Sequence, residues 1–165
     1  MLESGYAVDN NGFCITTGEF YEALSALLTD SSSEFYTGVE VQVVSGQTTP
    51  EIRSVVFSDF GLSYMVSTSY AGKDSFPKDN EPFNLITVIG DLSTDLNRLG
   101  MMTVSGAVLH MTNKDAKGWK AASDFSLELI DKAETWVKKG KLEYMYSNIS
   151  GTTYALAVRE IAAYK

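Results

Sequence analysis

The chain has 165 residues, of which 44% are hydrophobic and 21% charged, a composition typical of one folded globular domain. No apolar run approaches the roughly 18 residues of a membrane-spanning helix, and the single cysteine, Cys14, excludes an internal disulfide. The formal net charge of −8 disfavours general nucleic-acid binding, because phosphate backbones attract basic surfaces.

The charge is unevenly divided along the chain. Residues 1–100 carry 14 acidic and 4 basic side chains, whereas residues 101–165 carry 7 acidic and 9 basic ones. One interpretation is that the acidity only keeps a soluble protein monodisperse. The other is that an acidic patch meets a basic patch, either on another copy of the chain or on a different protein.

The first predicted elements are a hairpin and a helix. Residues 6–8 and 13–15 are apolar runs on either side of Asp-Asn-Asn-Gly, which suits a tight turn. Thr16 and Glu19 have the spacing of a capping box, which predicts that a helix begins here. One apolar stripe at helical spacing follows, made of Phe20, Leu24, Leu27 and Leu28. Three serines at 31–33 end the helix.

A run of strands is predicted next. In residues 39–43 apolar and polar side chains alternate, as in a strand with one wet face. Residues 52–57 and 62–70 are strands joined by a hairpin through residues 58–61. The second of these should place on one face Leu62, Tyr64, Val66, Thr68 and Tyr70. Residues 85–89 are apolar enough for a central strand.

The second half of the chain is predicted to hold the principal helix. Gly90 and Gly100 bracket a short helix, and residues 101–111 form a long strand. The principal helix covers residues 121–139; its end is marked by two lysines and by Gly140, which suits a left-handed cap. Glu128 with Lys132, and Glu134 with Lys138, form i,i+4 pairs on its wet side. Two strands, 142–146 and 154–161, are joined through Ser150-Gly151.

These elements predict a single α+β domain over residues 1–165. Its sheet is mainly antiparallel, with one longer helix in the C-terminal half and one shorter N-terminal helix packed on it.

Residues 7–18 have the glycine of an EF-hand calcium loop but not its ligands. With Gly12 at the sixth position, the first and twelfth positions fall on Ala7 and Gly18, which offer no side-chain oxygen. The hairpin and the capping box explain the same residues without an ion.

No catalytic set is recognisable. His110, the only histidine, falls near the end of the predicted strand 101–111 without a nucleophile beside it in sequence. One histidine and one cysteine are too few for a structural zinc site, and no phosphate-binding glycine loop is present. Cys14 lies in an apolar run with no adjacent cation to activate its thiol, which predicts a buried, unreactive thiol. We therefore expect no catalytic residue, no metal and no cofactor.

The long connection at residues 70–83 is the clearest candidate for a binding segment. It contains two prolines, mixed charges and two phenylalanines, and loops of this length are often functional or mobile. It is either a disordered surface excursion or a binding arm with Phe76 as its anchor. The candidate interaction residues, from this loop and from the basic run near residue 140, are Phe76, Lys78, Phe83, Lys138, Lys139 and Lys141.

The function expected from these features is that of a non-catalytic protein-interaction or assembly subunit. One example is a structural subunit of a viral or other large homo-oligomeric assembly, with acidic and basic surfaces in head-to-tail contact. An alternative is a small-ligand-binding or sensor domain with its pocket between helix and sheet. A third is an acidic inhibitor of a basic, nucleic-acid-handling protein.

The expected partner is another protein or a second copy of the chain, with no general nucleic-acid binding and no membrane. The first basic residue is Arg53, so no secretory signal is recognisable. We expect the protein in the cytoplasm or within a virion or other large particle.

Overall fold

The computed structural model describes residues 2–38, 41–43, 52–57, 61–74 and 76–165, and within these ranges it has the predicted α+β fold. The helices are α1 (Thr17–Thr29), α2 (Asp95–Thr112) and α3 (Gly118–Asp131), followed by a short 3-10 helix, η2 (Ala162–Tyr164). The strands are β1 (Val8–Asp9), β2 (Gly12–Phe13), β3 (Val41–Val43), β4 (Ile52–Phe57), β5 (Leu62–Ser69), β6 (Leu85–Asp91), β7 (Val137–Lys139), β8 (Leu142–Ser150) and β9 (Thr153–Glu160).

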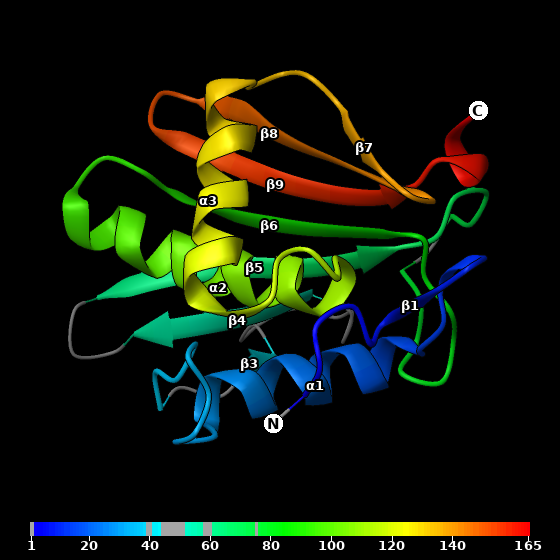
Figure 1. Cartoon of the computed structure of the whole chain (residues 1–165), viewed down its shortest axis with the longest axis horizontal. Coiled ribbons are helices and arrows are strands. Elements are labelled where there is room, and N and C mark those ends of the chain that lie inside the picture. Colours follow the sequence, from blue (N-terminus) through cyan, green and yellow to red (C-terminus); the bar gives the residue numbers. More distant parts are fainter. Residues whose placement is uncertain (1, 39–40, 44–51, 58–60, 75) are drawn as a thin grey trace.

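Seven of these strands form one antiparallel sheet in the order β3-β4-β5-β6-β9-β8-β7, and β1 and β2 form a separate hairpin. Because β6 pairs with β9, the strands β3 to β6 and the last three strands of the chain share one sheet. The three helices lie on one face of this sheet, with α1 on the side of β3 and α3 on the side of β8 (Figure 1). The two edges of the sheet, β3 and β7, are therefore far apart.

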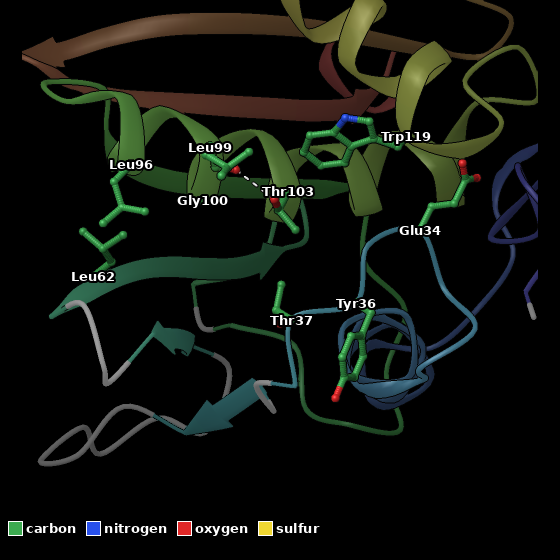
Figure 2. A pocket seen from close by; sticks show the side chains of 9 residues that line it. All are labelled: Glu34, Tyr36, Thr37, Leu62, Leu96, Leu99, Gly100, Thr103 and Trp119. Carbon is green, nitrogen blue, oxygen red and sulfur yellow. Dashed lines mark hydrogen bonds between the residues drawn. The ribbon is translucent and has the colours of Figure 1, made fainter.

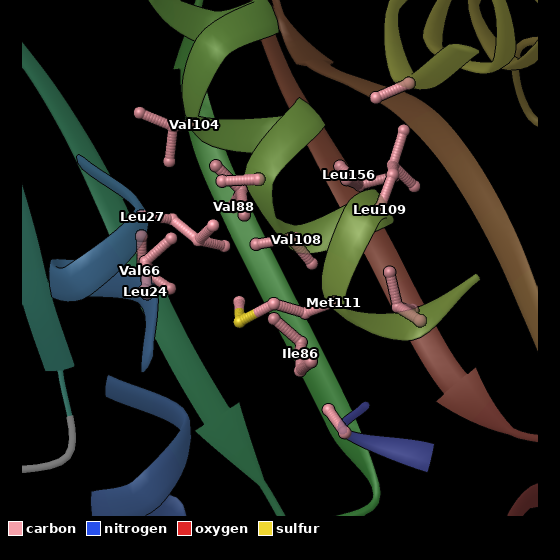
Figure 3. Close-up of a cluster of buried hydrophobic side chains, with 14 of the residues drawn as sticks. Leu24, Leu27, Val66, Ile86, Val88, Val104, Val108, Leu109, Met111 and Leu156 are labelled. Atoms are coloured by element: carbon pink, nitrogen blue, oxygen red, sulfur yellow. The ribbon is translucent and has the colours of Figure 1, made fainter. Parts of the chain in front are cut away.

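The core lies between this sheet and the helices. Helix α2 crosses β6, and aliphatic side chains from α1, β5 and β9 close around the contact (Figure 3). Each fully buried aliphatic side chain of this kind contributes about 1.5–3 kcal/mol. The alternation predicted for β5 is confirmed, since Tyr64, Val66 and Thr68 are buried and their neighbours are partly or fully exposed. The predicted central strand at 85–89 is also confirmed, as β6.

The predicted start of the chain is confirmed as well. β1 and β2 pair across Asn10-Asn11, and the side chain of Asp9 accepts a hydrogen bond from the amide of Asn11 (2.7 Å). The capping box is complete: Thr16 Oγ1 accepts from the amide of Glu19, and Glu19 Oε1 accepts from the amide of Thr16. The buried stripe of α1 includes the four predicted residues.

The prediction for residues 91–111 is wrong. Instead of a short helix and a long strand, one helix, α2, runs from Asp95 to Thr112 and passes through Gly100. The two glycines that seemed to bracket a helix serve one side chain instead. A Cβ at either Gly90 or Gly100 would stand less than 3.0 Å from the ring or hydroxyl of Tyr64. Because neither glycine has a Cβ, the buried ring of Tyr64 can pack between β6 and α2.

The prediction of a principal helix over residues 121–139 is also wrong. Helix α3 begins at Gly118 and ends at Asp131, and residues 137–139 form β7 instead. The ion pair between Lys132 and Glu128 is present (3.1 Å), but Glu134 and Lys138 are not on one helix. The predicted final hairpin, β8 and β9 through Ser150-Gly151, is confirmed.

The sheet face opposite the helices carries an arginine held by two rings. The Arg159 guanidinium lies 3.7 Å from the centre of the Trp136 ring and 5.0 Å from that of Tyr164, and its Nε donates to Glu143 (2.7 Å). This cluster ties β9, the turn before β7 and η2 together at the C-terminal end of the sheet.

Three predictions fall partly outside the described residues. These are residues 39–40 of the strand predicted at 39–43, the turn residues 58–60 between β4 and β5, and residue 75 of the long loop. The hairpin itself is confirmed by the pairing of Phe57 with Leu62. No helix in the described ranges is long and apolar enough to cross a bilayer.

Candidate functional site

Five lysines gather at one end of the sheet, contributed by three separate parts of the chain. They come from the connection between α2 and α3, from the β7–β8 hairpin and from the residue after η2. We call this surface the lysine end: Lys114, Lys138, Lys139, Lys141 and Lys165. The tip of the β1–β2 hairpin lies beside it, at the right-hand side of Figure 1.

The β7–β8 hairpin sets the directions of the central lysines. Lys138 pairs with Glu143 and Lys139 with Leu142, so the two lysines point to opposite faces of the sheet. Lys139 faces the helices, where its ammonium group lies 5.4 Å from the centre of the Phe125 ring. Gly140 takes a positive φ of 64° in the turn, which a glycine adopts without strain. These lysines therefore flank a tight turn rather than ending a helix.

Two adjoining clefts open at the lysine end. The larger, about 570 Å³, is lined by Lys138, Lys141 and Lys165, by the hairpin tip at residues 9–11 and by the start of η2. The smaller, about 240 Å³, is lined by Lys114, Lys139 and Lys141 and by the end of α2. Lys141 lines both clefts, so an anionic group bound beside Lys141 would be within reach of the lysines of both clefts.

The positive charge of the lysine end is not neutralised by ion pairs. Five lysines line the two clefts, against only two carboxylates, Asp9 and Asp115. Among the described residues none of the five lysines has a carboxylate oxygen within ion-pair distance, whereas lysines elsewhere, such as Lys120 and Lys132, do. A local excess of unpaired positive charge on a chain of net charge −8 is the most unusual electrostatic feature of the molecule.

A nearby carboxylate, Glu160, is engaged with the backbone instead. Its Oε1 accepts a hydrogen bond from the amide of Phe13 (3.1 Å), and it lies against Gly12. Partial burial raises the pKa of Glu160, and the negative charge of Asp9 raises it further. Glu160 is thus used to hold the β1–β2 hairpin to β9.

The predicted binding loop, residues 70–83, divides into two parts. Its second half is fastened to α1, because Glu81 O accepts from the amide of Thr17 (2.9 Å) and Asp79 O from that of Gly18 (2.7 Å). These bonds satisfy amides that the first turn of a helix leaves without intrahelical partners. This part of the loop is a cap for α1 rather than a free arm.

The candidate residues of this loop are placed in three different environments. Phe83 is only 2% exposed, and its ring centre lies 4.7 Å from that of Phe13 and 5.5 Å from that of Phe20, so it belongs to the core. Phe76 is half-buried beside a hollow of about 120 Å³. Lys78 is exposed, and its amide donates to the Glu81 carboxylate. None of the three lines the clefts of the lysine end.

His110 is buried in α2, where both ring nitrogens have partners. The amide of Gly118 donates to Nδ1 (3.2 Å), so Nδ1 carries no proton and Nε2 donates to Leu2 O (3.0 Å). The ring also packs 5.4 Å from that of Phe35. His110 therefore fastens the start of the chain and the start of α3 to α2.

The prediction of a buried thiol at Cys14 is wrong: the residue lies between β2 and α1 and is exposed. Burial of its surroundings and the Asp9 carboxylate both raise its pKa, which disfavours the reactive thiolate.

The lysine end can bind anions, and its side chains are those of a binding surface. Among the described residues no three histidine, cysteine, aspartate or glutamate side chains are grouped as metal ligands would be. Comparison with known protein families, curated proteins and solved structures finds no match to this chain.

Sequence patterns identified the lysines near residue 140 but missed the others. Lys114 and Lys165 are distant in sequence from the basic run at residues 138–141 and join the cluster only through the fold. The one available signal was the net positive charge of residues 101–165.

Proposed function

We propose that the protein is a non-catalytic assembly subunit whose copies associate head to tail, with the lysine end of one copy against an acidic surface of the next. The observation that carries this proposal is the cluster of five lysines without carboxylate partners on an acidic chain. Charges of one sign that are gathered and left unpaired repel each other, and a complementary partner surface removes that repulsion.

A complementary surface exists on α1. Glu19 and Glu22 of α1 are exposed, as is Asp30, the residue at its C-terminal cap, and α1 contains no lysine or arginine. We call these three residues the acidic helix face.

The two surfaces are at opposite edges of the fold. Helix α1 lies on the side of β3, whereas the lysine end surrounds β7, the other edge strand (Figure 1). They cannot meet within one molecule, so a contact between them joins two copies through different surfaces. Such a contact repeats and gives a ring or a filament.

The contact is expected to be made by side chains rather than by extension of the sheet. Within the described residues each edge strand has three residues, and β7 carries two lysines. Short, lysine-bearing edges are the usual protection against strand-to-strand pairing. If the lysines serve only to protect the sheet edge, the protein should be a monomer at every ionic strength.

Light scattering after size-exclusion chromatography separates the two readings. Association through charged surfaces should give a mass that rises with protein concentration in about 20 mM salt and falls toward the monomer in about 500 mM salt, because salt screens the contact. The variant Lys141→Glu/Lys165→Glu should be monomeric in both.

The matched control is Lys78→Glu/Lys117→Glu, which makes the same change of charge at exposed lysines that line neither cleft. It should associate like the unmodified protein. A monomer under all conditions, or equal effects of the two double variants, would count against the proposal.

A further inference from the structure

A second concave surface lies on the helix side of the molecule, away from the lysine end. It is a groove of about 460 Å³ between the first half of α2, the start of β5, the start of α3 and the segment after α1. We call it the apolar groove; its lining is Glu34, Tyr36, Thr37, Leu62, Leu96, Leu99, Gly100, Thr103 and Trp119 (Figure 2).

The groove holds much of the exposed apolar surface of the described chain. In the described part of the chain six large hydrophobic side chains are strongly exposed. Three of them line the groove: Tyr36 (53%), Leu96 (42%) and Leu99 (53%). On α2, Leu96, Leu99, Gly100 and Thr103 recur at helical spacing on one side. Contiguous exposed apolar surface of this kind marks binding sites more often than the surface at large.

The two ends of the groove differ in chemistry. Leu62, Leu96 and Leu99 gather at one end, whereas Trp119, Tyr36 and Glu34 come from the other side (Figure 2). The Glu34 carboxylate occupies the space where a Cβ on Gly118 would stand, at the start of α3. Among the described residues of the lining it is the only one with a charged side chain, and no described lysine or arginine forms an ion pair with it.

Two hydroxyl groups of the lining are bonded within the fold. Thr103 Oγ1 donates to Leu99 O (2.8 Å), and Thr37 Oγ1 donates to Leu28 O (3.3 Å). Gly100 is explained by the Tyr64 ring beneath it. Among the described residues of the lining, the carboxylate of Glu34 is the charged group to which an incoming ligand can respond.

We propose that the apolar groove binds a small amphiphilic organic cation, with the ammonium group at Glu34 and an aliphatic chain along the leucines. Indole and phenol rings attract cations through their faces, which adds to the attraction of the carboxylate. The field of an acidic molecule favours cationic ligands over anionic ones of the same shape.

The size of the groove favours a small molecule over a protein. Its volume is within the roughly 300–1,000 Å³ of small-ligand sites, whereas a stable protein partner covers about 800 Å² on each side. This site is separate from the lysine end, so the proposal does not depend on the head-to-tail association.

The test compares three probes with the same chain: n-octyltrimethylammonium, n-octyl sulfate and n-octyl glucoside, each below the concentration at which it forms micelles. Trp136 lies on the other face of the sheet, against Arg159, so a Trp136→Phe background leaves Trp119 as the fluorescent reporter. The cation should change the emission of Trp119 in a saturable way. It should bind at least about fivefold more tightly than either of the other two probes.

Two variants locate the site. Glu34→Gln keeps the shape of the side chain and should weaken cation binding by about fivefold while leaving the neutral probe unchanged. Leu99→Lys, at an exposed position, should abolish binding of the cation. Glu22→Gln, at an exposed carboxylate that does not line the groove, is the charge-matched control and should have no effect; circular dichroism checks that each variant is folded.

The proposal is overturned if the three probes bind equally, if Glu34→Gln binds the cation as tightly as the parent protein, or if no probe saturates. It is also overturned if Leu99→Lys leaves cation binding intact while dissociating a self-assembled form, because the groove then belongs to a protein interface.

Discussion

Replacing Gly100 with alanine tests the packing of α2 most sharply, because helix propensity and tertiary packing predict opposite results. Gly100 lies within α2, where alanine is favoured over glycine by about 1 kcal/mol. A Cβ at this position, however, would stand less than 3.0 Å from the hydroxyl and ring of Tyr64. That ring is buried and cannot withdraw without disturbing the core.

The opposing contributions can be compared. Displacing Tyr64 breaks the hydrogen bond from its hydroxyl to Asn97 O (2.9 Å), a loss of about 1 kcal/mol. Forcing an extra carbon into a filled core costs about 1–3 kcal/mol more. After the propensity gain, Gly100→Ala should lower the free energy of unfolding by about 1–3 kcal/mol.

Urea denaturation followed by circular dichroism measures this change. Gly106→Ala, in the same helix, is the control: the nearest atom to its Cβ would be Phe35 Cε1 at 3.0 Å, so its effect should stay within about 1 kcal/mol. Tyr64→Phe removes the closest atom, so the double variant should lose less than the sum of the single variants. If Gly100→Ala stabilises the protein, and its effect adds to that of Tyr64→Phe, the close contact between Tyr64 and α2 is contradicted.

Three further predictions concern single side chains. His110→Ala should lower the free energy of unfolding by about 2–4 kcal/mol in urea denaturation, because it removes the acceptor of the Gly118 amide and a buried ring; an effect below about 1 kcal/mol would contradict the bonded position of this histidine. Burial raises the pKa of Glu160, so the fold favours its protonated form and loses that stabilisation as pH rises through the raised pKa. Glu160→Gln still accepts from the Phe13 amide, and its stability relative to the parent should therefore increase from about pH 4 to about pH 7; a constant difference would count against the burial. Arg159→Lys keeps the charge but loses the flat contact with its two rings, and should cost about 1 kcal/mol at any salt concentration; full stability of this variant would show that the stacking contributes nothing.

Local signals predicted the first third of the chain well. The hairpin turn, the capping box and the apolar stripe of α1 each depend on residues that are close in sequence. The alternation of β5 likewise needs only its own residues. These elements carry the information for their own conformation.

The second half was mispredicted because long-range packing decided it. Gly100 and Gly106 resemble helix breakers, and the β-branched and aliphatic residues around them resemble a strand, yet they are the buried face of α2. Their glycines make room for Tyr64 and Phe35, which are far away in sequence.

The end of α3 was misplaced for a different reason. The chain reverses at Glu134, which has a positive φ of 67° although it is not a glycine. Its amide donates to Tyr146 O (2.8 Å), and its carboxylate accepts from the amide of Asn148 (2.6 Å). Contacts with β8 thus stabilise a turn that no glycine or proline marks, whereas Gly140 marks the next turn.

The candidate sites were predictable only in part. The basic run around Gly140 was visible in the sequence, although as a helix end rather than a hairpin. The apolar groove was not visible, since Tyr36, Leu99 and Trp119 come from three segments. Exposed apolar residues cannot be told from core residues before the fold is known.

Mixing two charge-reversed variants measures the proposed head-to-tail contact most directly. Lys141→Glu/Lys165→Glu makes the lysine end acidic, and Glu22→Lys/Asp30→Lys, both at exposed positions, gives the acidic helix face a net positive charge. Each variant alone should be monomeric by light scattering in about 20 mM salt, because its two surfaces then have the same sign. An equimolar mixture should regain the large mass, with the two variants in equal amounts in the assembled fraction. A mixture that stays monomeric while the unmodified protein assembles, or unmodified protein that never assembles, would contradict the account.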